Sequence, residues 1–174
     1  MNWLSDIYLI DAQGAAKVLN NRSMSDESAL KHVVVALAFG WLSFEVPLSF
    51  PFWGAEFELK SYIYQFIAFI LNAFIVYYGV RFSYRINAAG DGAEFFKRFT
   101  VLLLPVGVRV VLLFIPIMMV AGVISSYFGE EYGEESGGFV LALFGALGLV
   151  YQVIFYSQMG QYMTVASKKD GQRA

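Results

Sequence analysis

Four polar side chains interrupt long apolar stretches of this sequence and are its best candidates for chemistry. Two carry opposite charges, Glu45 and Arg109, and two are amides, Asn72 and Gln152. A charge inside a membrane costs about 2.5–3.5 kcal/mol on insertion scales, so each one needs a reason. An ion pair between Glu45 and Arg109 would offset most of that cost. The two amides would then satisfy the remaining donors and acceptors across helices.

The expected depths of these residues are compatible with one intramembrane polar cluster. Counted from the cytoplasmic end of each expected helix, the depths are about 18 Å for Glu45, 15 Å for Arg109, 12 Å for Asn72 and 10 Å for Gln152. Three interpretations of the cluster remain open. It is a structural clasp that fixes helix register, a pathway for a proton, ion or substrate, or a docking site for a partner.

The sequence lacks the residue types on which most enzyme sites depend. It has no cysteine and one histidine, His32, which excludes disulfides, thiol catalysis and cysteine- or histidine-rich metal sites. We therefore expect no enzyme, no cofactor and no metal; a membrane enzyme would have to use Glu45, Asp91 or tyrosines. His32 is interpreted as a side chain that reaches to the membrane interface, with a pH switch as the less favoured alternative.

Composition indicates which elements must position these residues. Of 174 residues, 58% are hydrophobic and 15% are charged, against about 45–50% and about 25% in soluble domains. A soluble core of this length cannot hide so much apolar surface, so lipid is expected to be part of the solvent. Four continuous apolar segments are long enough to cross a bilayer; they are about 33–53, 61–80, 99–124 and 139–159. We therefore predict an all-α integral membrane protein, a four-transmembrane-helix antiparallel bundle in one domain, 1–174.

The distribution of basic residues predicts the orientation of this bundle. Ten of the twelve lysines and arginines fall on one side, Lys60 alone falls on the other, and Arg109 lies within the membrane. Because cytoplasmic loops are enriched in these residues, both termini are predicted to be cytoplasmic, in a bacterial inner membrane. The other side carries the acidic run 129–138, interpreted as a solvated loop, with capture of a cation or a cationic partner as the alternative. A net charge of −2 gives no signal for nucleic acid.

The first segment has the pattern of an amphipathic helix. Over residues 3–20 the apolar side chains share one side of a helical wheel, and the polar ones lie mostly opposite. Such a helix can lie on the inner membrane surface or pack on the cytoplasmic end of the bundle. The sequence does not separate these two alternatives.

Two faces of small residues indicate helix packing beyond the bundle itself. One surrounds Gly40 in the first span, and the other surrounds Gly145 in the fourth. Small residues let helix backbones approach closely. We expect a homo-oligomer or a membrane-protein partner to use one of these faces; the alternative is that each face is filled by a neighbour within the bundle.

The loop between the second and third spans carries a resemblance to known families. The stretch Asn87 to Arg98, with Gly90-Asp91-Gly92 inside it and Pro105 beyond, resembles uncharacterised bacterial four-span inner-membrane proteins. It also resembles the Yip1-type loop, where a glycine and a phenylalanine lead into a proline-containing span, although Yip1 relatives typically have five spans. The resemblance implies a membrane-embedded, non-enzymatic family and transfers no functional residue.

These observations favour a protein that works through contacts. We expect a small polytopic inner-membrane accessory, assembly or immunity-type protein that acts through helix–helix contacts in the lipid bilayer. The alternative is an oligomeric transporter or channel that uses the Glu45 and Arg109 cluster near the membrane midplane.

Overall fold

The computed structural model describes residues 7–49, 59–132 and 137–168, and within them the secondary structure is helical throughout. The helices are α1 (Ala12–Asn20), α2 (Asp26–Ser49), α3 (Leu59–Ala89), α4 (Phe95–Tyr132) and α5 (Gly137–Ala166). Side chains are described for fewer residues, and those of 39–49 fall outside this set. The prediction of an all-helical chain is confirmed for the described residues.

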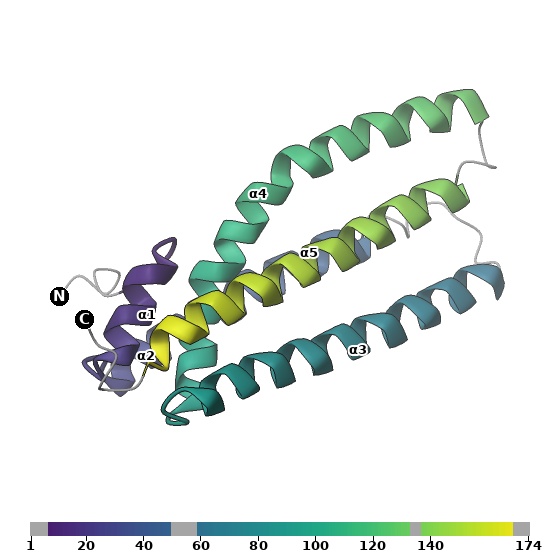
Figure 1. Cartoon of the computed structure of the whole chain (residues 1–174). Helices are drawn as coiled ribbons and strands as arrows, with labels where there is room; N and C mark the ends of the chain where they lie inside the picture. Colours follow the sequence, from purple (N-terminus) through teal and green to yellow (C-terminus); the bar gives the residue numbers. More distant parts are fainter. Residues whose placement is uncertain (1–6, 50–58, 133–136, 169–174) are drawn as a thin grey trace.

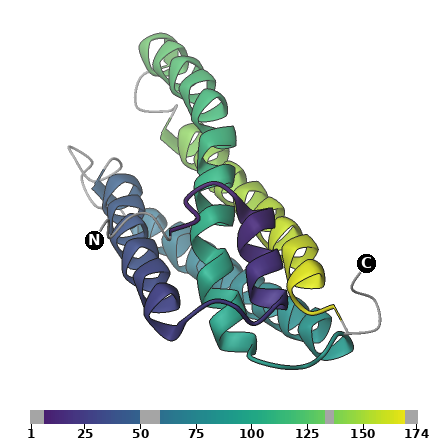
Figure 2. The same ribbon diagram turned by 90° about the vertical axis from the view of Figure 1, so that its left-hand side faces the viewer.

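The helices pack together at one end and separate toward the other (Figure 1). Helix α5 lies between α3 and α4 and packs against both, whereas α1 packs across α4 and α5, and α2 packs against α4. Figure 2, turned by 90°, shows α1 beside α4 and the end of α5 at this packed end. We refer to it below as the packed end, and to the opposite ends of α4 and α5 as the open end.

Helix α4 bends along its length and diverges from α5 toward the open end (Figure 1). It runs for 38 residues and contains Pro105 and Pro116. Each proline removes one backbone hydrogen bond and crowds the preceding turn, which is a common cause of helix bending. The first half of α4 can therefore pack into the core while its second half points away from α5.

The apolar core lies at the packed end. Side chains of α1, of α2 and the connection before it, and of α4 and α5 fill it together: Ala15, Ala16, Leu19, Met24, Ala29, Val101, Leu102, Met159, Met163 and Ala166. A second cluster continues along α4 and consists of Ala12, Val106, Val110 and Phe114. Alanine is the residue that lets a short helix such as α1 approach two others closely, and burial of these groups is the main stabilising contribution at this end.

Away from the core, the long helices carry exposed apolar side chains. Phe69 on α3 is 67% exposed, and Met119 and Val123 on α4 are 68% and 72% exposed. Two helical segments, Phe95–Phe128 and Leu143–Ala166, are long and apolar enough to cross a membrane by length and composition. This pattern weakly suggests membrane association. The segments contain most of the predicted third and fourth spans, while the predicted first and second spans fall largely within α2 and α3.

The N-terminal helix is shorter than the sequence predicted. Helix α1 begins at Ala12 rather than at residue 3, because the Asp11 carboxylate accepts a hydrogen bond from the Gly14 amide at 2.8 Å and caps it. Asp11 lies on the apolar side of the helical wheel, and this capping role accounts for it. The buried side of α1 faces α4 and α5, which corresponds to the packed alternative rather than to a helix lying on lipid.

Candidate functional site

The two amides, Asn72 of α3 and Gln152 of α5, lie side by side between these helices. The Gln152 side-chain amide donates a hydrogen bond to Oδ1 of Asn72. The second polar atom of this amide, Gln152 Oε1, is buried and has no hydrogen-bond partner within the described part of the chain. Because the amide pair joins α3 to α5, it fixes the register of these helices relative to each other.

Arg109 contacts α5 at a different level from the amides. Its guanidinium donates to the Tyr162 hydroxyl and lies 5.7 Å from the centre of the Tyr162 ring, which adds a cation–π contact. Tyr162 and Gln152 are ten residues apart on α5, so the two polar contacts are about 15 Å apart along its axis. The structure thus brings Asn72 and Gln152 together and places Arg109 elsewhere. The Glu45 side chain lies outside the described residues, so its pairing with Arg109 stays a prediction.

Of the two glycines predicted to pack against another helix, Gly40 and Gly145, the structure describes the surroundings of Gly145 alone. Gly145 on α5 is exposed, and a Cβ atom placed there would have no described heavy atom within 4 Å. The surroundings of Gly40 fall outside the described residues. Helices α3 and α5 approach closely instead at Gly79, where a Cβ atom would overlap the Tyr156 ring of α5, and at Gly160, where it would overlap the Phe82 ring of α3.

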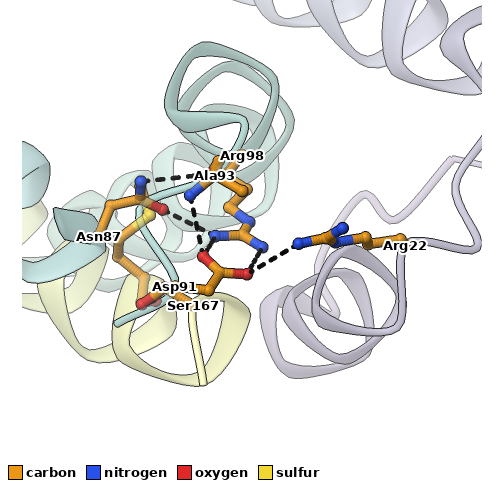
Figure 3. A network of polar contacts seen from close by, with 7 residues as sticks. Arg22, Asn87, Asp91, Ala93, Arg98 and Ser167 are labelled. Carbon is orange, nitrogen blue, oxygen red and sulfur yellow. Dashed lines mark hydrogen bonds and ion pairs between the residues drawn. The ribbon is translucent and has the colours of Figure 1, made fainter. Parts of the chain in front are cut away.

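A cluster centred on Asp91 ties several elements together at the packed end (Figure 3). We call Asn87, Asp91, Arg98 and the Ser167 carbonyl the Asp91 cluster. The Arg98 side chain is fully buried; its Nη2 donates to Asp91 Oδ2 at 2.7 Å, and its Nη1 donates to Asp91 Oδ1 and, at 2.9 Å, to Asn87 Oδ1. The Asp91 amide donates to the Ser167 carbonyl at 2.9 Å. The cluster therefore joins the α3–α4 turn to α4 and to the end of α5.

The backbone of the α3–α4 turn shapes this cluster. Gly92 and Glu94 have positive φ angles of 69° and 49°, a region that glycine adopts freely. At Gly90 a Cβ atom would overlap the Ser167 carbonyl oxygen, so a side chain here would displace the end of α5. The Asn87 side chain closes the turn by donating to the Ala93 carbonyl at 3.2 Å.

Pairing with Arg98 controls the charge state of Asp91. The hydrogen bonds from Arg98 lower the pKa of the Asp91 carboxyl from 3.8 to about 2, and they outweigh the opposing effect of burial. The Ala93 amide contributes a further bond at 3.1 Å. Asp91 is thus ionised at neutral pH. Its carboxylate accepts hydrogen bonds from both Nη1 and Nη2 of Arg98 and balances the buried charge of this side chain.

Two further contacts connect the N-terminal elements to this end. Arg22, just after α1, lies 3.8 Å from the Asp91 carboxylate. Lys97 on α4 donates to the Met24 carbonyl at 3.0 Å and to Asp26 at 2.7 Å, and the bond from Lys97 lowers the pKa of Asp26. The connection between α1 and α2 is therefore attached to α4 by charged hydrogen bonds.

His32 is a buried link rather than a residue at the membrane interface. Its side chain is fully buried, Nδ1 lies 2.8 Å from the Ser28 carbonyl, and Nε2 lies 3.0 Å from the Tyr8 amide. This geometry requires a neutral ring with the proton on Nδ1, since Nε2 must accept. The interfacial interpretation is therefore wrong: the ring fastens the segment before α1 onto α2 instead of reaching to lipid.

The Asp91 cluster was not predicted as a site from the sequence. In the sequence, Gly90-Asp91-Gly92 and Arg98 stood out only as parts of the loop that resembles known families. The available signal was the spacing of Asp91 and Arg98, seven residues apart across a glycine turn. Chemically, the cluster is a self-contained clasp in which the carboxylate, amide and guanidinium bind one another. Among the described residues, no group of three or more His, Asp or Glu side chains is placed to hold a metal ion.

Comparison with protein-family models, with curated proteins and with solved structures finds no match to this chain. The resemblance of the α3–α4 loop to Yip1-type and four-span bacterial proteins therefore stays a prediction.

Proposed function

We propose that this chain is a four-span membrane protein that acts through helix–helix contacts with another membrane protein, as an accessory, assembly or immunity-type subunit. The observation that supports this most directly is the contrast between the two ends. The packed end is filled by its own core and polar clasp. At the open end, Gly122, Gly145 and Gly148 have no described atom within 4 Å of a Cβ position, and Met119 and Val123 are exposed.

The charge distribution supports the proposed orientation. Lys31 near the start of α2, Arg85 near the end of α3, Arg98 near the start of α4 and Lys168 after α5 all belong to the packed end. In membrane proteins, lysines and arginines are enriched at the cytoplasmic ends of apolar helices. We therefore place the packed end in the cytoplasm and the open end toward the opposite side.

Contact rather than catalysis is favoured by how the polar groups are used. In the Asp91 cluster the carboxylate is engaged by Arg98, Arg22 and the Ala93 amide. A carboxylate held ionised in this way is a poor proton donor, and its oxygens are already occupied. The cluster is therefore suited to holding α3, α4 and the end of α5 in place.

A transporter or channel is the second candidate. It is favoured by Gln152, whose Oε1 is buried without a described partner, and by Arg109, which places a charge on an apolar helix. Polar groups of this kind inside membrane helices are often functional. In that case the open end would be one mouth of a pathway.

Reconstitution separates the two candidates. Liposomes that contain the purified protein should leak protons and potassium no faster than empty liposomes under the contact proposal. A photocrosslinking residue at Val123 or Gly145 should capture one defined membrane protein, or a second copy, in native membranes. The same residue at Ala88, exposed at the packed end, is the matched control and should not capture it. Flux well above that of empty liposomes, abolished by Arg109→Leu, would instead establish transport.

A further inference from the structure

One face of α3 near the packed end combines exposed arginines with exposed tyrosines. Phe74, Tyr77, Arg81, Tyr84 and Arg85 fall within about 100° of the helix circumference and are all exposed. We call these five residues the α3 stripe. The opposite side of the same helix is buried, because Gly79 faces Tyr156 of α5 and Ser83 is fully buried. Apart from Tyr84, whose ring contacts Phe95 of α4, the stripe points away from the rest of the described chain.

The two arginines of the stripe differ from other bases nearby in their partners. Arg98, Lys97 and Lys31 each lie within 3.0 Å of a carboxylate oxygen. Within the described ranges, neither Arg81 nor Arg85 has a carboxylate at ion-pair distance; Arg81 Nη1 donates instead to the Tyr77 hydroxyl at 3.2 Å. A guanidinium has five donors, so the stripe keeps positive charge and many donors facing outward.

The first three residues of the α3 stripe follow the order of layers at a membrane interface, and Tyr84 and Arg85 lie one helical turn further toward the packed end. The residue type changes from phenylalanine through tyrosine to arginine over Phe74, Tyr77 and Arg81, moving toward the packed end. Tyrosines concentrate at the level of lipid headgroups, with bases just beyond. Aromatic surface continues onto α4, where Phe95 contacts Tyr84 edge-on with ring centres 5.3 Å apart and Phe96 is 80% exposed.

We propose that the α3 stripe binds the phosphate of an anionic phospholipid in the cytoplasmic leaflet. Arg81 and Arg85 lie one helical turn apart on one face, which allows two guanidiniums to grip one phosphate, and the arginine fork matches phosphate oxygens. The Tyr77 hydroxyl accepts a hydrogen bond from Arg81 and holds it toward the level of the tyrosines, where the phosphate of a bound lipid lies. The acyl chains run along the exposed apolar face of α3. This inference rests on the proposed membrane embedding.

The test compares lipids that differ only in headgroup. Full-length protein in a neutral detergent is titrated with dioleoylphosphatidylglycerol or with dioleoylphosphatidylcholine, and the thermal unfolding temperature is followed. The anionic lipid should raise the unfolding temperature at low mole fraction, and the zwitterionic lipid should not. In the variant R81Q/R85Q, the half-saturating amount of anionic lipid should rise about 30-fold, on the usual contribution of a base near an anionic surface.

Two controls make the result specific. K17Q/K168Q removes two exposed bases from the same end with the same change in net charge, and it should keep the wild-type response. R81K/R85K keeps the positive charge but lacks the planar guanidinium. Its half-saturating amount of anionic lipid should fall between the values for the wild type and for R81Q/R85Q. Equal responses in R81Q/R85Q and K17Q/K168Q would overturn the proposal, because they would indicate a general charge effect.

The source of the phosphate is tested in the same assay. Inorganic phosphate and glycerophosphoglycerol carry the headgroup chemistry without acyl chains, and neither should reproduce the shift at matched concentration. A shift as large with these soluble anions would overturn the lipid proposal. A protein that fails to enter bilayers at all would refute the membrane embedding itself, which is a separate result.

Discussion

Asp91 connects several separate parts of this chain through a single carboxylate and its own backbone. Its oxygens meet Arg98 of α4 and Arg22 after α1, and its amide meets the carbonyl of Ser167 after α5. Asp91 therefore stabilises the packing of the packed end. Its contribution to the free energy of unfolding depends on the presence of both Asp91 and Arg98.

Removal of Arg98 should be among the most damaging single changes at the packed end. Arg98→Leu leaves the Asp91 carboxylate and the Asn87 amide partly buried without their main donor, at a cost of about 3–5 kcal/mol in unfolding free energy. The double variant D91N/R98L should recover part of this loss, because no unpaired charge remains. Thermal unfolding in detergent measures both; Lys168→Gln, an exposed base nearby, is the control. Additive losses would show that Asp91 and Arg98 do not stabilise each other.

The stability of the packed end should depend on acid through Asp91. Its folded pKa of about 2 lies below the ordinary value of 3.8, so its contribution is complete above about pH 4. That contribution of about 2 kcal/mol is lost as the pH falls from about 4 toward 2. Asp91→Asn should remove this part of the pH dependence of unfolding, whereas Glu94→Gln, at an exposed carboxylate, should keep it. An unchanged acid profile in Asp91→Asn would contradict the assignment.

The partner of Arg109 can be identified by double-mutant cycles. If Glu45 and Arg109 pair, each single change to leucine should cost about 3–5 kcal/mol, and the double change should recover much of that loss. Tyr162, which contacts Arg109, offers a second cycle with Tyr162→Phe. Coupling in the tyrosine cycle alone would assign Arg109 to α5 and leave Glu45 with another role. Coupling in the first cycle, with loss of function in a stable double variant, would make the pair functional.

At the scale of elements, apolar runs predicted where the helices lie but not how they meet. The runs 61–80 and 99–124 lie inside α3 and α4, as expected for continuous apolar sequence of this length. The start of α1 at Ala12 depends on the Asp11 cap, a local bond that a helical wheel does not reveal. Nor could depth along separate helices show that the α5 residue facing Arg109 is Tyr162 rather than Gln152, because the crossing of α4 and α5 depends on how α4 bends.

The contact between α3 and α5 depends on a glycine. A Cβ atom at Gly79 would overlap the base of the Tyr156 ring, so Gly79→Ala should force the two helices apart and lower the unfolding temperature. Gly145→Ala adds the same methyl group where no described atom lies within 4 Å, and it should leave the stability of the isolated protein unchanged. Equal effects of the two variants would contradict the α3–α5 packing.

For the whole molecule, the proposed membrane embedding predicts which side of the membrane each end occupies. The bases of the packed end serve two different purposes. Arg98 is paired with Asp91 and Lys97 is paired with Asp26, while Arg81 and Arg85 point outward. Under the proposed membrane embedding, both groups oppose transfer of the packed end across a bilayer, whereas Glu130 and Glu131 lie in the last turn of α4, at its other end. These charges support the proposed orientation, with the packed end in the cytoplasm.

Topology reporters test this orientation directly. Fusions after Ala174 and within the segment 85–94 should both report the cytoplasm, and a fusion near Tyr132 should report the other side, because the bases of the packed end hold it on the cytoplasmic face. The sharper variant changes Arg81, Arg85, Lys97 and Arg98 together to glutamine. Loss of these four bases from the helix ends that flank the α3–α4 turn should produce a mixed population with this turn on either side, whereas K17Q/K168Q should keep a single orientation. A wild-type C-terminus on the side opposite to the α3–α4 turn would rule out an even number of spans from α4 onward and with it the four-span arrangement.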